Sequence, residues 1–171
     1  HIVEESRLKD AIPIFLVDSN ILDNLDYYHL SKFQQSYLVQ SGFSGEQKQI
    51  CYLPNKDGEV ELVFIGNTDE FRDIGALIGS LVNNKYKVYN NLSDHEYWDL
   101  VVGFLMSEYK FNYYQDSQNK TRYVDKKSIQ LSVPDSFEVD HVKTLVHKKF
   151  KANAILAVRS SSVLEDGNEQ S

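Results

Sequence analysis

The sequence has few of the residues that cross-link a chain or anchor it in a membrane. It has one cysteine, Cys51, among 171 residues, which excludes an internal disulfide and a zinc site built on several cysteines. It has no run of 18 apolar residues, and its first residues lack the pattern of a signal peptide. These absences favour a cytoplasmic protein that is stabilised by an ordinary hydrophobic core.

The sequence motifs of several catalytic and phosphate-binding sites are also missing. The chain has no G-x-x-x-x-G-K-[ST], G-x-G-x-x-G, G-x-S-x-G or H-E-x-x-H pattern. Cys51 lies in the apolar stretch QICYLP, where a cysteine is typically a small buried side chain rather than a nucleophile. We therefore assign no catalytic, cofactor-binding or metal-ligating residue from the chain's own motifs.

The charge balance is acidic. There are 18 lysines and arginines against 25 aspartates and glutamates, so the net charge is −7. This argues against binding to nucleic acid or to an anionic membrane. Four lysines gather late in the chain, after two acids on the same predicted helix, which suits the helix dipole and indicates a solvated face. They are Lys143, Lys148, Lys149 and Lys151, after Glu138 and Asp140.

Hydrophobic periodicity predicts strands alternating with helices. IPIFLV, residues 12–17, is typical of a buried strand, and a helix follows that ends before Gly42. QICYLP and EVELVFIG flank PNKDGE and predict a hairpin. IGALIGSLV predicts a short helix whose Gly75 and Gly79 let it pack close to the sheet. KYKVYNN then predicts another strand.

The second half continues the alternation. Ser93 and Glu96 have the spacing of a capping box and begin a helix, after which the aromatic residues from Tyr109 to Tyr114 alternate as in a strand. QDSQNKT is then a loop, RYVDKKSIQLSV one or two strands, and residues 137–159 a last helix. The predicted fold is a three-layer α/β/α domain with a mostly parallel or mixed sheet. Its expected parts are an extension (1–10), the domain (11–135), a linker-type helix (136–159) and a frayed or non-native tail (160–171).

One segment, residues 93–114, concentrates polar side chains around a long apolar run. Glu96 has a local role in the capping box, and His95 and Asp99 lie four apart, which gives two ligands on one helix face but no third. We interpret the segment as structural. The full set is Asp94, His95, Glu96, Asp99 and Glu108.

The remaining histidines are not expected to form a site. His29 lies on a different predicted helix from His141 and His147. The latter two are six residues apart, about 600° around a helix, so they do not share a face.

The order of these segments resembles the N-terminal domain of the leucine (cytosol) aminopeptidase family, in its bacterial branch. The resemblance runs from IPIFLV through SGFSGEQKQICYLPNKDGEVELVFIGNTDE and IGALIGSLVNNKYKVYN to WDLVVGFLMSEYKFNYY, and covers about residues 11–115. The last stretch matches a signature at Trp98, Leu105, Tyr109, Phe111 and Tyr114.

That resemblance implies a macro-domain-like domain on the outside of a hexameric peptidase, which contacts its own catalytic domain and sister subunits. In the family, lysine, aspartate and glutamate ligands of the C-terminal domain hold two divalent metals, zinc or manganese, that activate a water. None of those ligands can be carried over here, because the N-T-D-A-E-G-R motif is absent and Asn67, Thr68 and Asp69 share only its first three letters.

The end of the sequence departs from the family. Where members continue from A-x-R into D-L-x-N-T-P, this chain reads SSSVLEDGNEQS, which suggests a truncated, frameshifted or engineered fragment. The main hypothesis is a non-catalytic domain for assembly and substrate access. The alternative is a stand-alone macro-like module that binds a nucleotide or ADP-ribose. Some family members bind DNA, but the acidic balance argues against that function here.

Overall fold

The backbone forms one mixed six-stranded sheet in the order β1-β6-β5-β2-β4-β3. The structure is a computed structural model that describes residues 1–118 and 128–152, without the side chains of residues 111–118. All neighbouring strands are parallel except β3 and β4, which are antiparallel. This confirms the predicted α/β class with a mostly parallel or mixed sheet. The strands are β1 (Ile2–Glu4), β2 (Ile12–Val17), β3 (Ile50–Pro54), β4 (Val60–Gly66), β5 (Lys85–Val88) and β6 (Gln130–Val133).

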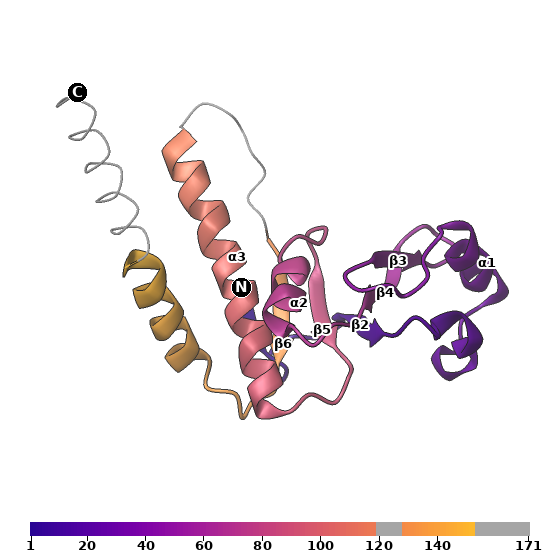
Figure 1. The fold of residues 1–171 in the computed structure, drawn as a ribbon, viewed down its shortest axis with the longest axis horizontal. Helices are drawn as coiled ribbons and strands as arrows, with labels where there is room; N and C mark the ends of the chain where they lie inside the picture. The colour runs from indigo at the N-terminus through magenta and orange to yellow at the C-terminus, as the bar shows by residue number, and fades with distance from the viewer. Residues whose placement is uncertain (119–127, 153–171) are drawn as a thin grey trace, which may run out of the picture.

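Helices pack against both faces of the sheet because successive strand residues point to opposite sides. Ile14 and Val63 belong to a core shared with α2 (Phe71–Ile78), α3 (Asp94–Gln118) and a final helix, residues 139–152. Leu53 and Phe64 belong to a second core shared with the 3-10 helices η1 (Ile21–Asp23) and η2 (Leu25–Tyr28) and with α1 (Lys32–Gln40). In Figure 1, α1 lies beside β3 and β4, while α2, α3 and the final helix lie together on the side of the molecule that holds β5 and β6.

Two predicted local signals are confirmed by hydrogen bonds. In the hairpin, Asn55 Oδ1 accepts from the backbone nitrogens of Asp57 and Glu59, and Gly58 adopts a φ of +84°. At the start of α3, Ser93 Oγ accepts from Glu96 N at 3.2 Å while the Glu96 carboxylate accepts from Ser93 N at 2.9 Å. Each signal satisfies backbone groups that would otherwise lack partners at a turn or a helix end.

The glycines of α2 do allow a close approach, but to α3 rather than to the sheet as predicted. A Cβ at Gly75 would lie 1.9 Å from the Leu100 carbonyl oxygen, and one at Gly103 would lie 1.9 Å from that of Arg72. The two helices therefore touch backbone to backbone. The prediction named the wrong neighbour because spacing alone shows a small-residue face without showing what lies against it.

The aromatic run from Tyr109 to Tyr114 is helical, so the predicted strand is wrong there. α3 continues to Gln118 and includes the first four residues of the predicted loop QDSQNKT. Once a capped helix has nucleated, each further residue adds a hydrogen bond at little cost, and no glycine or proline interrupts residues 104–118. Residues 119–127, which include the rest of that loop and part of RYVDKKSIQLSV, lie outside the described residues, as do residues 153–159 of the predicted last helix.

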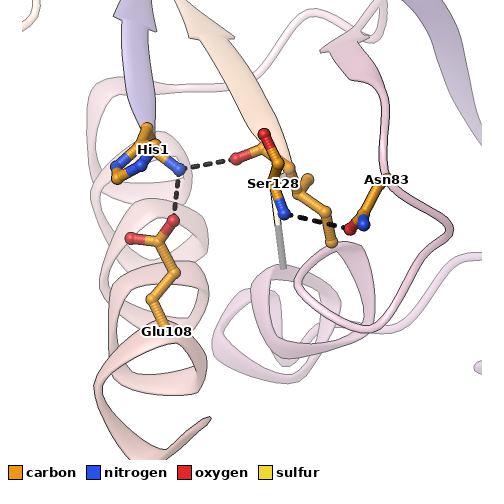
Figure 2. Close-up of polar contacts among 5 residues, drawn as sticks. His1, Asn83, Glu108 and Ser128 are labelled. Carbon is orange, nitrogen blue, oxygen red and sulfur yellow. Dashed lines mark hydrogen bonds and ion pairs between the residues drawn. The ribbon is translucent and has the colours of Figure 1, made fainter. Parts of the chain in front are cut away.

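The first residues of the chain form a strand that the sequence analysis did not predict. β1 pairs in parallel with β6 at the edge of the sheet, so residues 2–4 of the predicted extension join it. The backbone nitrogen of His1 bonds to the Glu108 carboxylate of α3 and to the Ile129 carbonyl oxygen at 2.5 Å (Figure 2). Figure 2 also shows Ser128 N donating to Asn83 Oδ1 at 3.0 Å. The predicted division into four parts stays a prediction.

Ser132 offers a test of this edge of the sheet. It lies on β6 next to Val3, its side chain is 1% exposed, and its hydroxyl has no partner among the described residues. Because an unsatisfied buried hydroxyl keeps its desolvation cost, Ser132→Ala is expected to raise the free energy of unfolding by about 1 kcal/mol. Urea unfolding would measure the change in the free energy of unfolding. Ser80→Ala is the control, because the Ser80 hydroxyl is exposed and already has a partner, the Leu77 carbonyl oxygen to which it donates. A loss of stability in Ser132→Ala would contradict the assignment.

Candidate functional site

The polar side chains at the start of α3 serve the helix and its neighbour. Asp99 lies 3.6 Å from Arg72 Nε of α2 and 3.4 Å from His95 Nε2. Glu96 closes the capping box, and Glu108 bonds to the backbone nitrogen of His1 further along the helix (Figure 2). The structure thus places these residues in separate local contacts rather than around one point.

The described residues do not supply a metal site of their own. Within residues 1–110 and 128–152, whose side chains the structure describes, no group of three histidine, cysteine, aspartate or glutamate side chains converges. The two divalent metals that the family resemblance implies therefore do not fit onto this part of the chain. None of the helices in the same described ranges is both long enough and apolar enough to cross a membrane.

Both late histidines pack against aromatic rings of α3. The ring centroids of His141 and Trp98 are 5.8 Å apart, and those of His147 and Tyr109 are 5.7 Å apart. The two histidines lie about 120° apart around the final helix. Each can therefore lie on one side of the helix surface that contacts α3. His29 lies elsewhere, at the end of η2 with a φ of +51°. The three imidazoles do not form a shared site.

Cys51 is buried on β3, within the second core. Burial raises the pKa of its thiol, although a hydrogen bond to Ser41 Oγ, 3.6 Å from Sγ, acts in the opposite direction. The reactive form of cysteine is the thiolate, so a raised pKa and poor access both slow its reactions. The geometry agrees with a small buried side chain.

We expect Cys51 to react slowly with an aromatic disulfide reagent in the folded chain at mildly alkaline pH. Because the pKa is raised only in the folded state, adding urea should increase the rate to that of a free thiol. The absorbance of the released thiolate measures both rates. A folded chain that reacts as fast as the unfolded chain would contradict the burial of Cys51.

The structure reveals a cavity that the sequence analysis missed. It has a volume of about 660 Å³ and lies where β5, β6 and the chain after β1 reach the carboxyl edge of the sheet, beside the first turn of α3. We call it the edge cavity. In parallel sheets this edge is the usual place for a bound ligand, because loops and helix starts converge there.

The lining of the edge cavity is acidic and aromatic. Glu5, Asp94 and Glu138 contribute carboxylates, and the lining cation, Lys87, lies 3.1 Å from Glu5. Tyr97 and Trp98 contact Phe137 with ring centroids 6.0 and 6.2 Å apart. Burial, with a smaller effect of Glu5, raises the pKa of Tyr97 to about 12, so its hydroxyl is neutral under ordinary conditions.

A signal for this cavity was present in the sequence. Asn90 and Asn91 follow the strand KYKV after one intervening residue, Tyr89, and Ser136 follows the strand that ends at Val133. Polar residues that follow two parallel strands meet at one edge of the sheet. The predicted strand KYKVYNN extends over Asn90 and Asn91, so the sequence prediction did not set them beside Ser136.

Comparison with known proteins identifies the family. A family described as "M17 aminopeptidase, N-terminal domain" matches residues 12–126. A search of curated protein sequences finds no match.

Two solved structures share the fold. The cytosol aminopeptidase of Coxiella burnetii superposes with a TM-score of 0.67 at 23% identity, covering 85% of this chain and 31% of its own. A mutant of tomato leucine aminopeptidase gives 0.56 at 10% identity, covering 85% and 34%. The chain thus spans about a third of the length of these structures. Together with the family match, this confirms the predicted resemblance, and the chain belongs to the family of M17 aminopeptidase N-terminal domains.

Proposed function

We propose that this chain is the non-catalytic N-terminal domain of a metal-dependent leucyl aminopeptidase and acts in assembly and in access of substrate. The match of residues 12–126 to a family of N-terminal domains carries the proposal. Two further observations support it. The similar solved structures are about three times as long, and the described residues place no three metal-binding side chains together.

The proposal includes the partners that the family implies. The catalytic domain, with two zinc or manganese ions, would supply the hydrolytic chemistry, and sister subunits would complete a hexamer. A cytoplasmic location is part of the same proposal and is supported by the description of one similar structure as a cytosol aminopeptidase.

A chimera tests the assembly role. The part of the Coxiella burnetii cytosol aminopeptidase that superposes on this chain would be deleted in one variant and replaced by residues 1–152 in another. We expect the deletion variant to lose its native oligomeric size and the chimera to recover it, as measured by light scattering after gel filtration. A chimera that folds, by circular dichroism, but keeps the size of the deletion variant would contradict the assembly role.

The alternative, a module that binds a nucleotide or ADP-ribose, receives no support from the charges at the sheet edge. A phosphate ligand needs cations or free backbone nitrogens around it. The charged side chains of the edge cavity are three carboxylates and one lysine that is already paired with Glu5, so their net charge repels a phosphate. We therefore propose no second function.

A further inference from the structure

We propose that the edge cavity binds a small organic cation, a primary ammonium group carried on an apolar body. This goes beyond the proposed role in assembly and does not depend on it. The inference combines the charge of the lining, its aromatic wall and the size of the space.

The charge of the lining selects for a cation. Among the described residues, the carboxylates of Asp94 and Glu138 take part in no ion pair, whereas Glu5 is paired with Lys87. Two carboxylates that line one cavity without an ion-pair partner attract a positive ligand. The same pair repels phosphates and carboxylates.

The aromatic wall selects for an organic cation rather than a metal ion. Tyr97, Trp98 and Phe137 line the cavity, with the first two ring centroids 6.0 and 6.2 Å from that of Phe137, and aromatic rings attract ammonium groups and accept apolar surface. The same arrangement already occurs within the cavity, where Lys87 Nζ lies 5.4 Å from the centroid of the Tyr89 ring. Among the side chains that the structure describes, no three of metal-binding type lie close enough together to hold a metal ion.

The size fits a small molecule. A volume of about 660 Å³ is within the range of ligand pockets, roughly 300–1,000 Å³, and far exceeds that of a bare ion. An ammonium group at the carboxylates would leave the rest of the space for an apolar body against the rings.

The chain contains its own reporter of binding. Trp98 is the single tryptophan and lines the edge cavity, so its fluorescence responds to a ligand there without any label. The 171-residue chain would be titrated at neutral pH with cyclohexylmethylammonium, cyclohexylmethanol and cyclohexanecarboxylate, which share one ring and differ in charge. We expect a saturable change with the ammonium, binding about tenfold weaker for the alcohol and no binding of the carboxylate.

Paired variants separate a specific site from general charge attraction. Asp94→Asn with Glu138→Gln is expected to weaken ammonium binding at least about tenfold. The matched control, Asp57→Asn with Glu59→Gln, removes the same charge from the exposed hairpin and should leave binding unchanged. Thermal melts by circular dichroism would show that both variants fold.

Three results would overturn the proposal. They are the lack of a saturable response to the ammonium, equal affinity for the alcohol, and full affinity in the Asp94/Glu138 variant. ADP-ribose is included as a fourth titrant and is expected to give no response. A saturable response to ADP-ribose in place of the ammonium would assign the cavity to nucleotides instead.

Discussion

Replacing Gly75 with alanine is expected to lower the free energy of unfolding by about 3 kcal/mol. The added Cβ would lie 1.9 Å from the Leu100 carbonyl oxygen and 2.7 Å from Phe104 N, and both atoms belong to the backbone of α3. Neither can rotate away, so α2 must move off α3 and open the core they share. The urea midpoint, followed by Trp98 fluorescence and by circular dichroism, measures the loss.

Two other glycines provide the comparison. A Cβ at Gly79 would lie 2.6 Å from Ser107 Oγ, which can change rotamer, and 2.9 Å from Ser107 Cβ, which needs only a small shift, so Gly79→Ala should cost less than Gly75→Ala. Gly58→Ala should cost about 1 kcal/mol, because its φ of +84° strains any residue with a Cβ while the space around it is open. If Gly75→Ala were as stable as Gly79→Ala, the close backbone contact between α2 and α3 would be wrong.

The second large effect concerns the core beneath α1. Phe64 is fully buried on β4, and its ring contacts those of Phe15, Tyr28 and Phe43 at centroid distances of 6.2, 5.0 and 6.1 Å. Phe64→Ala removes the side chain that these three share and leaves a cavity, so we expect a loss of about 3–5 kcal/mol. Urea unfolding followed by circular dichroism measures it.

An exposed phenylalanine is the control for this prediction. Phe33 lies on α1 with 47% of its surface exposed, so Phe33→Ala should change the free energy of unfolding by less than about 1 kcal/mol. Equal losses in the two variants would mean that the second core does not centre on Phe64.

The sequence predicted the elements whose signals are local. IPIFLV, the PNKDGE hairpin, the glycine after α1 and the Ser93–Glu96 box all act within a few residues, and all are confirmed. A second box of the same kind, formed by Ser31 and Gln34 at the start of α1, was equally readable from its S-x-x-Q spacing and was missed.

The misses depend on distant neighbours. β1 has only three residues, and it forms a strand by pairing with β6, which lies more than a hundred residues later in the sequence. The aromatic run after Ser107 fits a strand by alternation, yet Tyr109 packs in a helix against His147 and Phe150 of the final helix. Likewise, the edge cavity joins residues that are far apart in the sequence, from Glu5 to Glu138, so no short stretch of the sequence contains it.

The central claim is that this chain forms a scaffold and that its relatives' chemistry belongs to residues it does not contain. The direct test is hydrolysis of leucine p-nitroanilide by the purified 171-residue chain with added zinc or manganese, alongside a chelator-treated sample. We predict a rate equal to that of the protein-free blank under every condition. Metal-dependent turnover that co-purifies with the chain and disappears with the chelator would contradict the account.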